Sequence, residues 1–361
     1  MSQDILNPRM LVHNLSEKIR ACYVLPGAAE AICACLQQHL EAGEYADIEE
    51  GELLGLALTL HLQEVSHDEH LWVRWHEVPL PEGEEALRQN AQWQEERMLE
   101  ARLGNYGINR VERLPGNVGL LEIRYLHRPA WGGDTLAAAM NFIAHAQALI
   151  IDLRNCSGGY PGMVVLALSY LFGEEPVHLS SIYWRDDDFT QQYWSLSYVP
   201  GRRFLEKPVY VLTSKVTFSA GEAFASILQN RKRALVLGDQ TDGGAHPGVS
   251  YRLNPHFEAF IPVGRGFDPL TGADIEGSGV TPDILVPQEQ AFKAAYHMAL
   301  RSVLASLVEP ASESLWNLAK EAQAALKELE QGRKICLKCG YPTPPYLGKC
   351  KNCGEIFSSE A

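Results

Sequence analysis

Four cysteines near the C-terminal end of the sequence have the spacing of metal ligands. Cys336 and Cys339 form one Cys-x-x-Cys pair, Cys350 and Cys353 form a second, and ten residues separate the pairs. Four thiolates suit one tetrahedral zinc ion, and a site without an open coordination position is structural rather than catalytic. The same residues also fit a single iron, two redox dithiols or two disulfides. We expect a zinc ribbon with one ion in residues 334–361.

A serine in the middle of the sequence is the second candidate for chemistry. Ser219 follows an apolar run and a polar turn and precedes a helical pattern, in VYVLTSKVTFSAGEAFASILQN. At a helix N-terminus, a serine lies beside free backbone N–H groups and the positive end of the helix dipole. Ser219 would form an acyl-enzyme there, with the Ala220 N–H stabilising the oxyanion. The alternative is a capping box of Ser219 and Glu222, which needs no chemistry.

A glycine-rich turn provides a candidate for a second oxyanion donor. The run ALIIDLRNCSGGYPG predicts a strand that ends near Asp152, followed by a turn that contains Gly158 and Gly159. Adjacent glycines let the backbone approach a ligand closely and expose its N–H groups. The plain alternative is a tight connection between a strand and a helix.

The elements that must position these residues follow from the apolar pattern. Apolar residues recur every three or four positions from residue 11 to about residue 64, which predicts helices, and a strand is expected around Val73. From about residue 106 to 300, short buried-type strands alternate with helical patterns, which is typical of an α/β fold. We expect an N-terminal helical domain (1–76), a linker (77–105), a core (106–300) and a connecting helix (301–333) before the ribbon.

Composition and charge restrict the function further. The 361 residues carry a formal net charge of −14, and 46% of them are hydrophobic. An acidic chain argues against general binding to nucleic acid or to an anionic membrane. The sequence shows neither a secretory leader nor an apolar run of the about 20 residues that a membrane span needs. We expect a cytoplasmic protein, and the sequence leaves its oligomeric state open, a homo-oligomer included.

Four motifs in a fixed order resemble a known family. LRNCSGG is followed by TFSAGEAFA, then by GDQTDGGAHPG and then by IEGSGVTPDI. This order is similar to that of the tail-specific (C-terminal processing) serine proteases, and most of all to the branch of interphotoreceptor retinoid-binding protein and tricorn protease. The resemblance covers about residues 11–300. It implies a crotonase-like core of stacked β-β-α units and an N-terminal helical domain.

The resemblance also implies roles for individual residues. Ser219 matches the nucleophile, and the N–H groups of Ala220 and Gly159, or of Gly158 in place of Gly159, match the oxyanion hole. The processing proteases use a lysine as base, but Gly244 stands where that lysine would be.

The branch similar to tricorn uses a histidine base instead of that lysine. It implies that His70 in SHDEH is the base, oriented through Ser66 and through Glu276 as the distal carboxylate. His67 is a rival for the base, and His246 is a weaker one.

Two classes of function are compatible with these residues. The first is a serine hydrolase, most of all a peptidase that cleaves a peptide or protein through an acyl-enzyme on Ser219. The second is a non-catalytic module that binds an apolar ligand or a peptide on the same fold. Residues 77–105 are too few for the PDZ domain that processing proteases carry, so substrate selection by that route is in doubt. The ribbon is expected to contact a protein.

Overall fold

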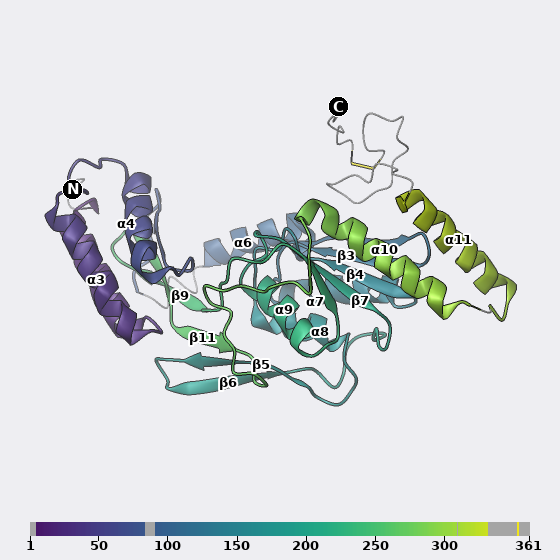
Figure 1. Ribbon diagram of the computed structural model, residues 1–361. Coiled ribbons are helices and arrows are strands. Elements are labelled where there is room, and N and C mark those ends of the chain that lie inside the picture. Colours follow the sequence, from purple (N-terminus) through teal and green to yellow (C-terminus); the bar gives the residue numbers. More distant parts are fainter. Residues whose placement is uncertain (1–4, 84–90, 309, 331–351, 354–361) are drawn as a thin grey trace, which may run out of the picture. The chain divides into compact units, whose positions relative to one another are not determined.

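The computed structural model describes residues 5–83, 91–308, 310–330 and 352–353 (Figure 1). The chain divides into two compact units. The first unit is drawn from residues 1–100, 178–193 and 243–278, and the second from residues 101–177, 194–242 and 279–361.

Three helices begin the first unit: α2 (Pro8–Cys22), α3 (Pro26–Glu41) and α4 (Gly51–Ser66). Proline stands at the start of α2 and of α3, where its missing N–H removes no helical hydrogen bond. The Asn7 side chain caps α2 by accepting from the N–H groups of Arg9 and Met10. One face of each helix is buried in a shared core that includes Leu11, Leu15, Ile19, Ile32, Leu36, Leu54, Leu58 and Leu62.

Two small sheets complete the first unit. One is antiparallel, in the order β1 (Trp72–Trp75), β10 (Phe257–Pro262) and β9 (Gly248–Arg252). The other has the order β11 (Gly264–Phe267), β5 (His178–Trp184) and β6 (Phe189–Trp194). Because β1 pairs with β10, with Val73 opposite Ala259, a strand close to the N-terminus is joined to one more than 180 residues later.

The second unit is built on a six-stranded mixed sheet. Its order is β12 (Ile284–Leu285), β8 (Leu235–Gly238), β7 (Val209–Thr213), β4 (Ala148–Asp152), β3 (Val118–Ile123) and β2 (Ile108–Leu114). All neighbouring pairs are parallel except β2 with β3. Every residue of β3, β4 and β7 is buried, as expected of strands that are covered on both faces.

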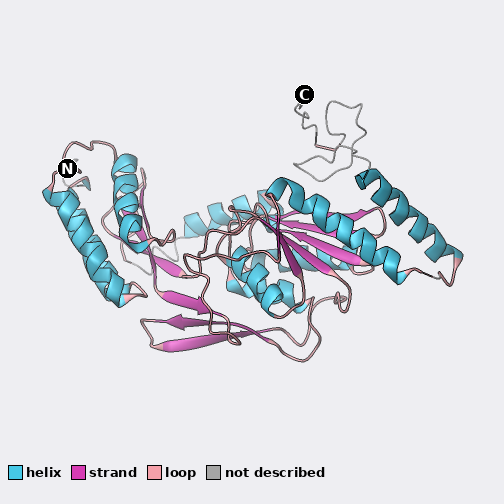
Figure 2. Ribbon diagram, viewed as in Figure 1, coloured by secondary structure: helices cyan, strands magenta, loops and turns pink. Residues whose placement is uncertain are grey.

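Helices cover both faces of this sheet (Figures 1 and 2). On one face, α10 (Gln288–Ser306) and α11 (Glu313–Glu330) share a core with the strands. The other side holds α7 (Pro129–Ile143), α8 (Pro161–Ser169) and α9 (Ala220–Asn230). Helix α6 (Ala91–Leu103) begins in the segment of the first unit and ends in that of the second, and the short helix η1 (Asn105–Gly107) follows it.

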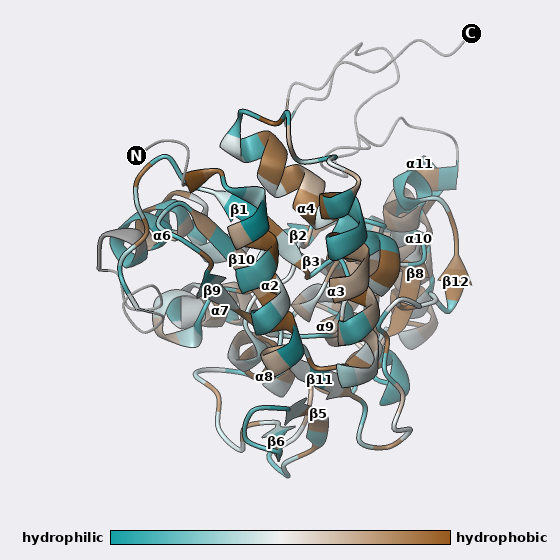
Figure 3. Cartoon of the chain, turned by 90° about the vertical axis from the view of Figure 1, so that its left-hand side faces the viewer, coloured by the Kyte–Doolittle hydropathy of each residue, from teal (hydrophilic) through white to brown (hydrophobic). Residues whose placement is uncertain are grey.

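Helix α4 shows why hydropathy alone does not identify a packing face. Its residues are hydrophobic around most of the helix, as the brown segments of Figure 3 show. Leu54, Leu58 and Leu62 are fully buried, whereas Leu53, Leu56 and Leu60 are more than half exposed. The packing of the neighbouring elements therefore decides which leucines form the core.

The α/β fold with an N-terminal helical region is confirmed, but the arrangement differs from the expected domains in two respects. The structure groups residues 178–193 and 243–278 with the N-terminal helices, because strands of these segments pair with β1 or with each other. The segment 301–333, expected as one connecting helix, contains the end of α10 and all of α11, with Pro310 between them. No helix of the described residues is long and apolar enough to span a membrane.

Candidate active site

Ser219 lies between the end of β7 and the start of α9, in a strained conformation. It is the N-cap residue of α9, with φ 53° and ψ −119°. An ordinary N-cap serine has extended backbone angles, and a non-glycine residue at positive φ costs on the order of 1–3 kcal/mol. Capping alone does not require this conformation, because an unstrained N-cap serine would serve as well. The strain is typical of a nucleophile held at a sharp turn from strand to helix.

A buried carboxylate holds this turn in place. Glu222 is completely buried, and its Oε2 accepts a hydrogen bond of 2.8 Å from the Ser219 backbone N–H. Its Oε1 accepts one of 2.6 Å from the hydroxyl of Thr241, which itself accepts from the Val280 N–H. The capping pattern of the sequence is thus present, and it fixes the backbone of the serine rather than competing with its chemistry.

The glycine-rich turn that follows β4 lies directly against Ser219. Gly158 and Gly159 have φ values of 115° and 139°, which side chains rarely adopt. A Cβ at Gly158 would lie 2.9 Å from the Ser219 Cβ and 3.5 Å from its Oγ. A Cβ at Gly159 would lie 2.3 Å from the Leu126 carbonyl oxygen. Glycine is therefore required at both positions for this close approach.

Hydrogen bonds tie the serine turn to the glycine turn. The Phe218 N–H donates to the Cys156 carbonyl (2.9 Å), and the Thr217 hydroxyl donates to the Leu153 carbonyl (2.8 Å). The Ser214 hydroxyl donates to the carbonyl of Arg154, whose guanidinium pairs with the buried Asp152 at 2.6 Å. The two turns thus form one rigid structure.

Two backbone amides in this structure are available to a ligand. Among the residues that the structure describes, neither the Ala220 N–H nor the Gly159 N–H has a hydrogen-bond acceptor. Buried backbone donors are normally paired, so donors left open beside a serine suggest that a ligand oxygen completes them. The arrangement matches the chemistry of an oxyanion hole.

Cys156 is not a rival nucleophile. It is fully buried, and burial raises the pKa of its thiol to about 11. A thiol with that pKa is protonated at neutral pH and therefore unreactive.

In the first unit, Asp68 is the centre of a buried polar cluster. It is 1% exposed, and it lies just after α4. Its carboxylate accepts from the Tyr23 hydroxyl (3.1 Å) and from the His70 backbone N–H (3.0 Å). His70 Nδ1 lies 3.8 Å from Asp68 Oδ1. The Ser66 hydroxyl accepts from the Asp68 backbone N–H at 3.1 Å, so Ser66 shapes the turn that carries the carboxylate.

His246 lies on the same cluster, surrounded by carboxylates. Its Nδ1 is 3.2 Å from Asp68 Oδ2 and 3.5 Å from Glu276 Oε2, and its Nε2 is 3.7 Å from Asp274 Oδ2. Burial alone would lower the pKa of His246, but hydrogen bonds to Asp274 and Asp68 and the charge of Glu276 raise it to about 9. The imidazole of His246 is therefore a cation at neutral pH.

Burial favours the neutral forms of Glu276 and His70, whereas His246 is charged. Burial, with the nearby charge of Asp68, raises the pKa of Glu276 to about 7, although its Oε2 accepts from the Ala245 N–H. Burial lowers the pKa of His70 below its usual 6.5, and the charge of Asp68 opposes this shift only in part. His70 is therefore neutral at pH 7, in the state that accepts a proton.

The structure places the predicted site residues in two groups. Ser219, Ala220, Gly158 and Gly159 come together in the second unit. Ser66, His70, His246 and Glu276 belong to the cluster of the first unit, whereas His67 is exposed, in the left-handed conformation at the end of α4.

Three residues were not assigned a role in catalysis from the sequence. Glu222 and Thr241 hold the serine turn, and Asp68 is a carboxylate within reach of His70. The signal for Asp68 was its place in the pattern Ser-x-Asp-x-His, two residues before His70.

Two groups of residues outside the serine turn contain possible metal ligands. The carboxylates of Asp68 and Glu276 and the imidazole of His246 lie close enough together to hold an ion, but the cation on His246 opposes this. Of the four cysteines expected to bind zinc, Cys336, Cys339 and Cys350 lie outside the described residues, and Cys353 is exposed.

The serine turn, its glycine-rich partner and the open amides have the arrangement that a serine hydrolase needs. Residues 118–286 match the model of peptidase family S41, and residues 6–103 match the N-terminal domain of this family's peptidases in eukaryotic IRBP. The two regions adjoin in this order and together cover most of the chain. Residues 118–286 are therefore similar to the S41 peptidases, and residues 6–103 to the N-terminal domain of their IRBP members.

Curated relatives agree with this assignment. The tail-specific protease of Haemophilus influenzae is 31% identical over 157 residues, which are 40% of this chain and 21% of that protein. The carboxyl-terminal-processing protease of Picosynechococcus is 30% identical over 145 residues, or 40% of this chain and 33% of that protein. The chain thus spans a third or less of the length of these two relatives.

Solved structures share the fold at lower identity. A lipoprotein from Streptococcus agalactiae matches 81% of this chain and 96% of its own, with a TM-score of 0.53 and 13% identity. The tricorn protease matches 89% of this chain and 37% of its own, with a TM-score of 0.50 and 13% identity. At 13% identity, these two matches show a shared fold and nothing about function.

Proposed function

We propose that the protein is a serine peptidase in which Ser219 attacks the peptide carbonyl. The observation that carries the proposal is the strained Ser219 at the start of α9, packed against Gly158 and beside two open amides. Such strain persists only where the surrounding structure enforces it, and here Glu222 and the glycine-rich turn do so. The amides of Ala220 and Gly159 are the proposed oxyanion donors, with Gly158 as the alternative.

His70 is the proposed general base. Its lowered pKa leaves the imidazole neutral at pH 7, and the Asp68 carboxylate, 3.8 Å from Nδ1, is close enough for its charge to stabilise the imidazolium that forms. His246 is unsuitable, because its cation has no lone pair to accept the serine proton. His67 is exposed at the end of α4 and lacks such a carboxylate in its described contacts.

Ser66 and Glu276 serve the base indirectly in this proposal. Ser66 fixes the turn of Asp68, so it positions the carboxylate rather than touching the substrate. Glu276 was expected to orient the base as the distal carboxylate. The described contacts of its carboxylate are with His246 and Ala245. We therefore propose that Glu276 acts on His70 indirectly, by changing the net charge of the cluster.

The reaction then takes two steps. The Ser219 oxygen bonds to the carbonyl carbon while His70 takes the hydroxyl proton, and the amides bind the oxyanion. His70 returns the proton to the leaving amine as the peptide bond breaks, which leaves an acyl-enzyme. Water attacks this ester, His70 again takes and returns a proton, and the carboxylic acid product leaves with Ser219 restored.

The substrate class follows from the family. One curated relative is named a tail-specific protease and another a carboxyl-terminal-processing protease, so we propose a peptide or protein substrate, cleaved near its C-terminus. The absence of a PDZ domain stays a prediction, as does a cytoplasmic location. The alternation of strands and crossover helices around the β3–β4–β7 sheet supports a crotonase-like core.

The pH dependence of covalent labelling tests the proposal and identifies the base. We expect a fluorophosphonate to label the protein, because it reacts with an activated serine. The labelling rate should rise with pH through a midpoint below 6.5, as His70 loses its proton, and then stay level to about pH 8. The rates are measured over pH 5 to 10 by fluorescence in a gel. A midpoint near 9 would indicate His246 in place of His70, and an unlabelled protein that binds an apolar ligand tightly would favour the binding module.

The ribbon is proposed to hold one zinc ion and to contact a protein. Its four cysteines provide a closed set of thiolates, so the metal would stabilise the segment without entering the reaction. The double variant Cys336→Ser/Cys339→Ser should bind one equivalent of zinc less than the wild type by elemental analysis. Cys22→Ser, in helix α2, is the control and should bind as much zinc as the wild type. Equal zinc in the double variant and the wild type would contradict a zinc ribbon.

A further inference from the structure

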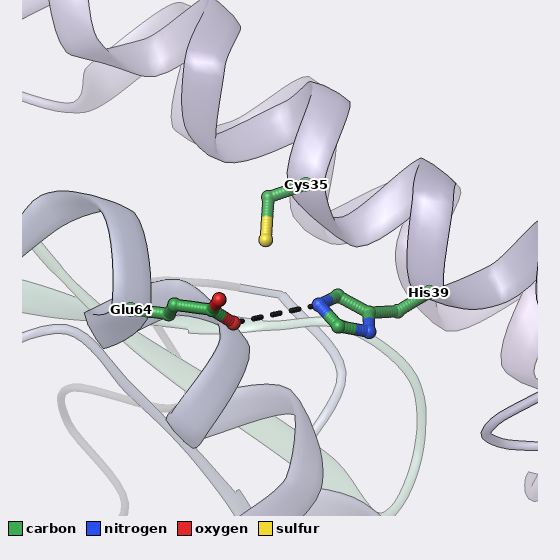
Figure 4. A group of neighbouring side chains, drawn as sticks. All are labelled: Cys35, His39 and Glu64. Atoms are coloured by element: carbon green, nitrogen blue, oxygen red, sulfur yellow. Dashed lines mark ion pairs between the residues drawn. The ribbon is translucent and has the colours of Figure 1, made fainter.

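A second group of metal-ligand types lies far along the sequence from the ribbon, on helices α3 and α4. Cys35 and His39 are four residues apart on α3, so their side chains lie on the same face of that helix. Glu64 lies on α4, which packs against α3. Figure 4 shows the sulfur, the imidazole and the carboxylate pointing toward one another from the two helices.

The distances suit a single ion. The ligand atoms of Cys35, His39 and Glu64 all lie within 4.8 Å of one another, and His39 Nε2 is 3.5 Å from Glu64 Oε2. A tetrahedral zinc ion with ligands at about 2.1 Å holds its nitrogen and oxygen ligands about 3.4 Å apart. The imidazole and the carboxylate are therefore already at the spacing that an ion would impose. The Cys35 thiol contacts the His61 carbonyl at 3.6 Å and would give up this contact to become the third ligand.

A second carboxylate lies at the other nitrogen of His39. Glu44 Oε2 is 2.8 Å from His39 Nδ1, although the two do not form a hydrogen bond. A small rotation of the Glu44 side chain would let Nδ1–H donate to this carboxylate and leave the lone pair of Nε2 for a metal. Metal-bound histidines commonly donate their other N–H to a carboxylate in this way.

The ring of His39 is also held in place by its neighbour on α4. His61 stacks on it with 3.5 Å between ring centroids and 6° between the planes. The Tyr45 hydroxyl lies 2.7 Å from His61 Nδ1 and so fixes the stacking ring. A ligand whose orientation is set before the ion arrives loses less conformational entropy when the ion binds.

The site is open to solvent on one side. The side chain of His39 is 19% exposed, and that of Glu64 is 62% exposed, so an ion can enter without unfolding the helices. Three protein ligands leave the fourth tetrahedral position for water.

We propose that Cys35, His39 and Glu64 bind one Zn²⁺ ion that joins α3 to α4. One thiolate, one imidazole and one carboxylate are the ligand types that zinc accepts together. The ion would hold two helices of the N-terminal core together, and it is independent of the ribbon and of the reaction at Ser219.

The test uses the full-length chain in which all four ribbon cysteines, Cys336, Cys339, Cys350 and Cys353, are replaced by serine. After treatment with EDTA and titration with Zn²⁺, this protein should bind about one equivalent, with a dissociation constant of about 1 μM or tighter, and its thermal midpoint should rise. Adding His39→Ala should abolish binding and the thermal shift. His13→Ala is the matched control, because His13 is an exposed histidine that also pairs with a glutamate, on α2 of the same unit.

Co²⁺ reports on the ligands directly. The protein without ribbon cysteines should give the visible bands of four-coordinate cobalt and a thiolate charge-transfer band, and Cys35→Ser should remove the latter. If His39→Ala unfolds, Glu64→Gln replaces it, because that exposed side chain is not needed for folding; it should weaken binding at least tenfold. Failure of the parent protein to bind Zn²⁺, or unchanged binding in the variant that stays folded, would overturn the proposal.

Discussion

Ser219→Ala is expected to lower peptide hydrolysis by about 10⁴-fold or more and to abolish labelling by fluorophosphonates. The substitution removes the oxygen that forms the acyl-enzyme, and what the oxyanion donors and substrate binding still provide is a small part of the rate. The fold should survive, because the hydrogen bond from the Ser219 backbone N–H to Glu222 remains, and only the capping contact of the hydroxyl is lost. Circular dichroism and thermal unfolding check this, and turnover of a peptide substrate measures the loss.

A second serine on the same helix provides the control. Ser226 lies on α9, and its hydroxyl contacts only the side chain of Asn230 among its described partners. Ser226→Ala should keep activity within about twofold of the wild type. If Ser219→Ala keeps more than a tenth of the wild-type rate, Ser219 is not the nucleophile.

His70→Gln is expected to lower the hydrolysis rate by about 10²- to 10⁴-fold, because general base catalysis contributes a factor of this size. The effect should be on kcat rather than KM, since the imidazole acts on the serine proton and not on the bound peptide. Removal of the base should also remove the rise in labelling rate below pH 6.5. Steady-state kinetics over pH 5 to 8 measure both effects.

The rival histidine is tested in parallel. His67 has φ 52°, so His67→Asn is the suitable substitution, because asparagine tolerates this conformation. It should retain nearly full activity. A large loss in His67→Asn together with normal rates in His70→Gln would exchange the roles of the two histidines.

The sequence predicted the parts of the fold that carry a local hydrophobic signal. β3, β4 and β7 are continuous apolar runs and were recognised as buried strands. β6 (Phe189–Trp194) has the sequence FTQQYW and is mostly exposed, so no hydrophobic pattern marks it. The pairing of β1 with β10 joins distant segments, and local periodicity contains no information about such a partner.

The candidate site was predictable in residue type but not in geometry. The position of Ser219 followed from the order of strand, turn and helix, whereas its strained φ depends on tertiary contacts with Gly158 and Glu222. The charge states of His246 and His70 also could not be predicted from the sequence. Asp68 is more than 200 positions from Asp274 and Glu276 in the sequence, and only their approach to His246 in the fold makes that imidazole a cation and leaves His70 as the suitable base.

Peptide mapping of the labelled wild-type protein tests the central claim most directly. The protein is reacted with a fluorophosphonate at pH 7.5 and digested, and the adduct is located by tandem mass spectrometry. The account predicts a single adduct, on Ser219, at about one equivalent per chain and absent after prior denaturation. An adduct on another residue, or none on a folded protein that still cleaves peptides, would contradict it.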